Sequence, residues 1–115
     1  MDTQYSKDRD GHRAKTHIDL ADRRVLIIDT RKSTVSKRLT TRASVHLREE
    51  TGVLSHRIGF GGPCGDYSRV IFNESVRVTG QAVREQHQRA LDMVHVLMME
   101  VQAHYASATA RSAAA

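Results

Sequence analysis

Basic and hydroxyl side chains alternate with apolar ones along residues 38–48, and this pattern points to anion binding. In an extended chain, one face of this stretch carries Arg38, Thr40, Arg42, Ser44, His46 and Arg48. Guanidinium groups form planar, paired hydrogen bonds with phosphate. Residues two apart on a strand are roughly 7 Å apart, a spacing that suits successive phosphates of a single nucleic-acid strand. The sequence therefore predicts a nucleic-acid-binding face; the alternative is a solvated sheet face with no ligand.

The neighbouring residue types refine this prediction. No acidic residue interrupts residues 38–48, which favours an anionic ligand. The chain has no Trp, three Tyr and two Phe, whereas proteins that bind single strands commonly stack bases on aromatic rings. Near the sheet edge only Tyr67 and Phe60 could stack. We expect contacts chiefly to phosphates, with weak sequence preference and strong salt dependence.

Alternation with period two predicts a half-buried strand over residues 38–48. Its apolar face carries Leu39, Thr41, Ala43, Val45 and Leu47. A second alternating run, residues 53–60, is expected to pair with it antiparallel, with Leu47 opposite Leu54. This register adds Arg57 to the basic face and places His46 and His56 on opposite faces.

The remaining elements follow from similar patterns. Residues 16–20 and 24–30 read as a hairpin, and the second run is apolar on both faces, as in a central strand. Residues 67–72 read as a further strand. Thr79 is a suitable N-cap for one long helix from Gly80 to about Tyr105, whose apolar stripe includes His87. We expect His87 to be a hydrogen-bonded core or interface residue.

These elements predict an α+β fold: an antiparallel meander of four to five strands with one long C-terminal helix packed on one face. Residues 1–15 are expected to be a flexible arm that adds sequence-independent contacts. Residues 16–105 form the domain, and residues 106–115 a disordered Ala- and Ser-rich tail. The order of elements resembles in topology the Pur-alpha repeats and the Whirly-type single-strand binders, but no residue motif carries the likeness and no residue role follows from it.

Other residues that could do chemistry give weaker patterns. Cys64 lies in a glycine-rich stretch, residues 59–66, and could act as a nucleophile, but the sequence identifies no partner histidine. The histidines do not converge on a metal site, and paired carboxylates are missing. Asp29 is expected to form a salt bridge with a flanking arginine. We therefore expect a protein that is not an enzyme and uses neither cofactor nor metal.

Composition limits the cellular setting and the partners. The 115 residues can form one core and carry a net charge of +5, mostly from arginine. The single cysteine and the absence of a signal peptide or a bilayer-length apolar run predict a cytoplasmic protein with no membrane association.

Val96, Met99 and Ala103 lie opposite the main helical stripe, which favours a homodimer through the C-terminal helix. The alternatives to nucleic-acid binding are a regulatory protein that docks an acidic protein partner, and a small-molecule binder that uses residues 59–66 and the helix.

Overall fold

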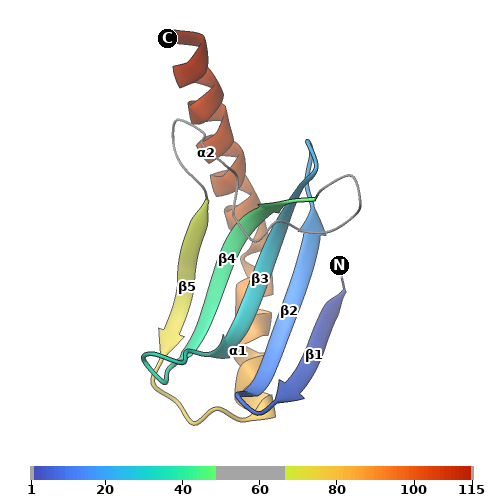
Figure 1. The fold of residues 1–115 in the computed structure, drawn as a ribbon, viewed down its shortest axis with the longest axis vertical. Helices are drawn as coiled ribbons and strands as arrows, with labels where there is room; N and C mark the ends of the chain where they lie inside the picture. Colours follow the sequence, from blue (N-terminus) through green and yellow to red (C-terminus); the bar gives the residue numbers. More distant parts are fainter. Residues whose placement is uncertain (1, 49–66, 115) are drawn as a thin grey trace.

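The computed structural model describes residues 2–48 and 67–114, and it confirms the α+β class. Five antiparallel strands form one meander sheet in the order β1-β2-β3-β4-β5, and two helices follow. The strands are β1 (Thr3–Asp8), β2 (Gly11–Asp19), β3 (Arg24–Lys32), β4 (Leu39–Leu47) and β5 (Ser68–Glu74); the helices are α1 (Gly80–Asp92) and α2 (Val94–Ala114). Helix α1 lies behind β2, β3 and β4, and α2 continues beyond the end of the sheet (Figure 1).

The predicted hairpin is β2–β3, and β3 is the central strand. Ile18 pairs with Leu26, and the chain turns over residues 21–24. Asp22 and Arg23 have φ values of 60° and 64°, the positive values that a tight type I′ hairpin turn requires at both central positions. The run from Val25 to Ile28 is buried on both faces of the sheet, as expected.

Strand β4 has the predicted alternation, but the predicted pairing of Thr41 and Ala43 with the run 53–60 is wrong. Its helix-facing residues Leu39, Thr41, Ala43 and Val45 are all 0% exposed. The neighbours of β4 are β3 and β5, and Ala43 pairs with Arg69 of β5. From Leu39 to Ser44 both edges of β4 are therefore occupied, by β3 and β5. Residues 53–60 lie outside the described residues. Alternation fixes which face of a strand is buried, but it does not choose among partners with similar patterns.

The flexible arm predicted for residues 1–15 is replaced by β1 and the first half of β2. These strands pair along their length, from Thr3 opposite Thr16 to Asp8 opposite Gly11. Strand β1 is an edge strand whose side chains are mostly exposed, so it lacks the apolar alternation that marks a buried strand. Gly11, at φ 114°, begins β2 directly after the turn.

The helical region begins where the sequence predicts it but contains a break. Thr79 caps α1, and its side chain accepts a hydrogen bond from the backbone N–H of Ala82 at 3.1 Å. The single long helix is wrong, because Met93 leaves helical geometry at φ −106° and ψ 18° and separates α1 from α2. No Pro or Gly marks this position. Helix α2 extends to Ala114, beyond the end expected near Tyr105 and through most of the predicted tail.

Helix α1 is joined to the sheet by a chain of buried hydrogen bonds in addition to apolar packing. The links are Thr3 to Thr16 (2.7 Å), Thr16 to His87 Nε2 (2.7 Å), His87 Nδ1 to Thr30 (2.8 Å), Thr30 to Thr41 (2.7 Å) and Thr41 to Gln86 Oε1 (2.8 Å). The Gln86 amide nitrogen donates to Leu39 O at 3.1 Å and to Glu74 Oε1 at 2.8 Å. His87 and Gln86 are 0% exposed, so His87 is the hydrogen-bonded core residue that the sequence predicts. This chain fixes which face of the sheet α1 covers.

Candidate nucleic-acid interface

The sheet face opposite the helices, here called the far face, carries the predicted binding residues. Strand register places Arg42 of β4 beside Asp29 of β3, and Thr40 beside Arg31. Arg13 and Lys15 of β2 share this face because they lie one residue from Ala14 and Thr16, which face α1. Basic side chains from three adjacent strands therefore meet on one surface.

The seven predicted site residues differ in their exposure and in their hydrogen-bond partners. Arg38 and Arg42 are exposed and Thr40 is half-buried, so these three can reach a ligand. Ser44 is only 8% exposed, and its hydroxyl is hydrogen-bonded to His46 Nε2 at 3.1 Å. Arg48 is engaged by Asp19, 3.1 Å away. Arg57 lies outside the described residues. The fully exposed cations of the predicted row are thus Arg38 and Arg42, near its beginning, whereas His46 and Arg48 are half-buried.

An acidic residue from a neighbouring strand lies within the basic face. Asp29 accepts hydrogen bonds from Arg13 Nε at 2.9 Å and Arg13 Nη2 at 2.7 Å. This is the salt bridge expected for Asp29, although the arginine is a neighbour across strands rather than along the chain. The hydrogen bond to Asp29 raises the pKa of Arg13. Because Asp29 is already paired, it subtracts little from the positive potential beside Arg42.

At the opposite end of the far face β3 is closed to solvent, whereas His17 and Asp19 of β2 are exposed. Val25 and Ile27 are 1% and 5% exposed, although they point away from the helices. Tyr67, proposed as a stacking residue, is 8% exposed, and its hydroxyl donates to Glu100 Oε2 of α2 at 2.8 Å. Burial, followed by the bond to Glu100, raises the pKa of Tyr67 to about 12. The stacking role of Tyr67 is therefore wrong, and the accessible cations lie elsewhere.

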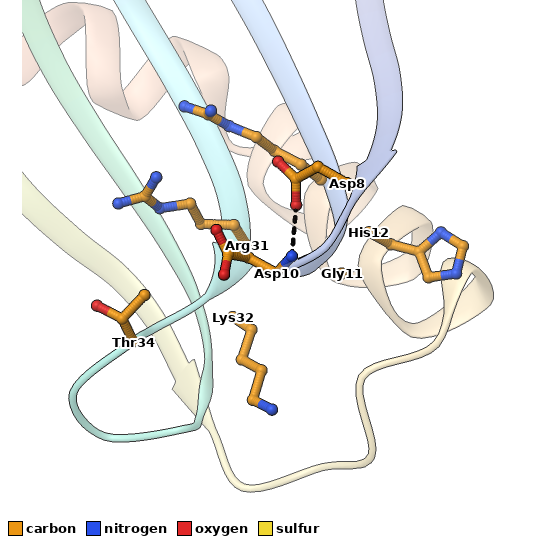
Figure 2. A pocket seen from close by; sticks show the side chains of 8 residues that line it. Asp8, Asp10, Gly11, His12, Arg31, Lys32 and Thr34 are labelled. Atoms are coloured by element: carbon orange, nitrogen blue, oxygen red, sulfur yellow. Dashed lines mark hydrogen bonds between the residues drawn. The ribbon is translucent and has the colours of Figure 1, made fainter.

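Exposed cations gather where β3 ends and β4 begins, and we call this cluster the basic end. It consists of Arg9, Arg31, Lys32, Lys37, Arg38 and Arg42, all exposed. Three hollows of about 30, 130 and 300 Å³ adjoin one another here and share Thr34. Figure 2 shows the smallest, which is lined by Arg31 and Lys32 of β3, by Asp8 at the end of β1 and by Asp10 in the turn that follows. The carboxylate of Asp8 accepts from Asp10 N at 2.8 Å, so one of the two nearby acids is engaged locally.

Side-chain pairing distinguishes the basic end from five of the other arginines, although Arg77 and Arg84 are also exposed and form no salt bridge with a described residue. Five arginines lie within salt-bridge distance of carboxylates: Arg13, Arg24, Arg48, Arg69 and Arg89. Within residues 2–48 and 67–114, no carboxylate forms a salt bridge with any of the six cations of the basic end. The basic end therefore concentrates positive charge that the fold itself does not use.

The loop that joins β3 to β4 is held in one shape by its own hydrogen bonds. Ser33 N donates to Arg38 O at 2.8 Å, and Lys37 N donates to Ser33 O at 3.0 Å. The Ser33 hydroxyl accepts from Val35 N at 3.3 Å and from Ser36 N at 3.2 Å. Lys37 adopts φ 62° to close the turn. The loop thus presents its side chains from a fixed backbone.

Sequence patterns missed four members of the basic end, of which Arg9 falls in the expected flexible arm and the other three lie around the β3–β4 turn. Arg31, Lys32 and Lys37 stand in a stretch that reads as a polar connection, because strand β3 continues to Lys32 beyond its apolar run. Their positions on either side of the β3–β4 turn could have revealed them. A hairpin brings the end of one strand beside the start of the next, so cations on both sides of the turn lie close together.

Two other classes of site find no support in the described part of the chain. No group of three metal-binding side chains occurs within residues 2–48 and 67–114. Cys64 and His56 lie outside those residues. None of the helices described is long and apolar enough to cross a bilayer.

Comparison of this chain with models of known protein families, with characterised proteins and with solved structures finds no match.

Proposed function

We propose that this protein is a small, non-enzymatic nucleic-acid-binding protein that holds the sugar-phosphate backbone at its basic end, with single strands favoured. The observation that carries the proposal is the gathering of six exposed cations at the basic end, none of them in a salt bridge with a described residue. Five arginines form salt bridges within the fold, whereas Arg31, Arg38 and Arg42 are exposed and form none with a described residue. Unpaired arginines on a rigid surface suit phosphate, which accepts their planar, paired donors.

The surroundings of the basic end support low sequence specificity. Hydroxyls of Thr34 and Thr40 line the same hollow as Arg31 and Arg42, and such groups commonly donate to phosphate oxygens. Among the described residues no Phe, Tyr or Trp lines any of the three hollows, and the one ring is that of His12 in the smallest. Affinity would come mainly from phosphate contacts and counterion release, which depend little on base identity.

The proposal is tested with labelled oligonucleotides of one sequence, presented as a single strand and as a duplex. At about 50 mM salt we expect both to bind, the single strand more tightly, with affinity falling steeply as salt rises. Failure of both to bind at that salt would overturn the proposal. Nuclease treatment of a pull-down addresses the acidic-partner alternative, because a retained acidic protein, with no nucleic acid needed, would favour that alternative instead.

A homodimer through α2 forms part of this proposal. Val96 and Met99 are 49% and 69% exposed, and Ala103 and Ala106 follow at spacings of four and three residues. Alternating spacings of three and four residues place side chains along one seam of a helix, where a second helix can pack. Two basic ends on one strand would raise the apparent affinity by multivalency. The proposal also retains the cytoplasmic location expected from the single cysteine.

A further inference from the structure

The largest hollow of the basic end has the composition of a site for one nucleotide. It has a volume of about 300 Å³, and its walls come from β3, the β3–β4 loop and β4. The lining residues are Asp29, Arg31, Ser33, Thr34, Val35, Thr40 and Arg42. Its volume is at the lower end of the range for small-ligand pockets, about 300 to 1,000 Å³.

Two arginines flank this hollow at a separation that suits one phosphate. Arg31 pairs with Thr40 and Asp29 pairs with Arg42, so Arg31 and Arg42 are diagonal neighbours on the far face. Diagonal neighbours on adjacent antiparallel strands are about 7 to 8 Å apart, within reach of two long side chains that converge on one anion. Arg42 Nη1 donates to Ser68 Oγ of β5 at 3.0 Å, which holds that guanidinium on the β5 side of β4 and leaves its other donors available.

The acid in the hollow does not compete with a phosphate for these arginines. Both carboxylate oxygens of Asp29 accept from Arg13, at 2.9 and 2.7 Å. Arg13 lies on β2, on the other side of β3 from Arg42. The pair holds Asp29 toward β2 and leaves Arg31 and Arg42 with positive charge to offer to a ligand.

The loop adds an apolar contact next to the charged one. Val35 lines the hollow and is 91% exposed, more than any other large apolar side chain described. The backbone around it is fixed, because Ser33 Oγ accepts from Val35 N. The apolar side chain of Val35 therefore lies beside the two cations Arg31 and Arg42. These two features match the two parts of a nucleotide, since the face of the base is apolar and the phosphate is charged.

We propose that this hollow binds one nucleotide of a single strand, with the phosphodiester between Arg31 and Arg42 and the adjacent base against Val35. The inference rests on the proposed function and specifies where and how the strand is held. A duplex keeps its bases stacked inside the helix, so only its phosphates reach the hollow. The preference for single strands therefore originates in Val35, and the affinity for phosphate in the two arginines.

Charge-conserving substitutions separate a defined site from general attraction to positive charge. The double variant Arg31→Lys, Arg42→Lys keeps the net charge but loses the paired donors of both guanidinium groups. The matched control, Arg9→Lys with Arg38→Lys, alters two cations of the basic end that do not line this hollow. The probes are a labelled 20-nucleotide single strand and the duplex of the same sequence, with unchanged circular dichroism required of each variant.

We expect the double variant to bind the single strand about tenfold more weakly than the control does, which corresponds to about 1.4 kcal/mol. Val35→Ser should weaken binding of the single strand severalfold and leave duplex binding unchanged. Equal affinities of the double variant and the control would overturn this site and leave the proposed function intact. If the unaltered protein binds neither probe, the proposed function itself is overturned. Displacement of the strand by millimolar inorganic phosphate would also count against the inference, because the hollow would then take a free anion.

Discussion

The Nδ1 atom of His87 on α1 lies 2.8 Å from the Oγ1 atom of Thr30 on β3, inside the buried chain that joins helix to sheet. The donor and the acceptor of every hydrogen bond in this chain can be assigned by starting from Gln86, at the other end of the chain. The amide nitrogen of Gln86 donates twice, so its oxygen accepts from Thr41. Thr41 has then used its proton and accepts from Thr30, and Thr30 in turn accepts from His87 Nδ1. Neutral His87 consequently carries its proton on Nδ1 and accepts from Thr16 at Nε2.

This arrangement predicts a His87 ring that is neutral at pH 7 in the Nδ1–H form. Burial lowers the pKa of His87 below its ordinary value, and the partial opposing effect of Asp29 does not restore it. The expected result in a nitrogen-15 NMR titration is a protonated Nδ1, an unprotonated Nε2, and a titration midpoint below about 6.5. A midpoint above that value would contradict the buried network.

The same lowered pKa predicts acid sensitivity. Because the folded state binds the proton on His87 more weakly than the unfolded chain does, the free energy of unfolding should fall as pH drops below about 6.5 and this loss should level off below the lowered pKa. Urea unfolding from pH 8 to pH 5 measures it. The variant His87→Gln should lose less stability than the unaltered protein over that pH interval; an equal loss would assign the effect to other groups.

Removing one hydroxyl from the network should be costly. Thr30→Val leaves the Nδ1–H donor of His87 buried without an acceptor, and we expect a loss of about 2 kcal/mol in the free energy of unfolding. Thr40→Val is the matched control, because Thr40 lies on the far face and forms only long hydrogen bonds, at 3.4 and 3.5 Å. That variant should change stability by less than about 0.5 kcal/mol. Similar losses in the two variants would mean that the network contributes no more than an exposed hydroxyl.

Substituting Lys37 by glycine should raise the stability of the fold and weaken nucleic-acid binding at the same time. Its φ of 62° is unfavourable for a residue with a side chain, so Lys37→Gly should stabilise the fold by about 1 kcal/mol. The same change removes one cation from the basic end and should weaken nucleic-acid binding. Lys37→Ala removes that charge without relieving the backbone, so thermal unfolding should distinguish the two variants. Equal unfolding temperatures would show that the turn is not strained at Lys37.

The proposed dimer seam is tested by placing a charge on α2. Met99→Lys introduces like charges into the seam of two facing helices, and sedimentation should change from a dimer to a monomer. Gln88→Lys adds the same charge on the exposed side of α1 and should leave the dimer intact. A monomer in the unaltered protein at micromolar concentration would exclude the seam.

Patterns of period two and 3.6 predicted those parts of the fold that bury one face. Leu39 to Val45 and the α1 stripe are examples, because an element that buries one face has apolar residues at a regular spacing in the sequence. Strand β1 was missed because both its faces are polar, and the break at Met93 because no Pro or Gly produces it. At the candidate site, alternation placed Arg42 and Thr40 on the face opposite Leu39 and Thr41, where the structure has them. It could not show that Arg48 is paired with Asp19, or that Arg31 lies beside Thr40, since both depend on which strands are neighbours.

The central claim, that nucleic acid binds at the basic end, is tested most directly by the salt dependence of single-strand affinity. The triple variant Arg31→Gln, Arg38→Gln, Arg42→Gln should reduce the slope of log K against log salt by about 2, since each lost phosphate contact removes about 0.7. The control variant Arg77→Gln, Arg84→Gln removes exposed charge from the β5–α1 connection and from α1, and should retain nearly the full slope. Equal slopes for the triple variant and the unaltered protein would contradict the claim.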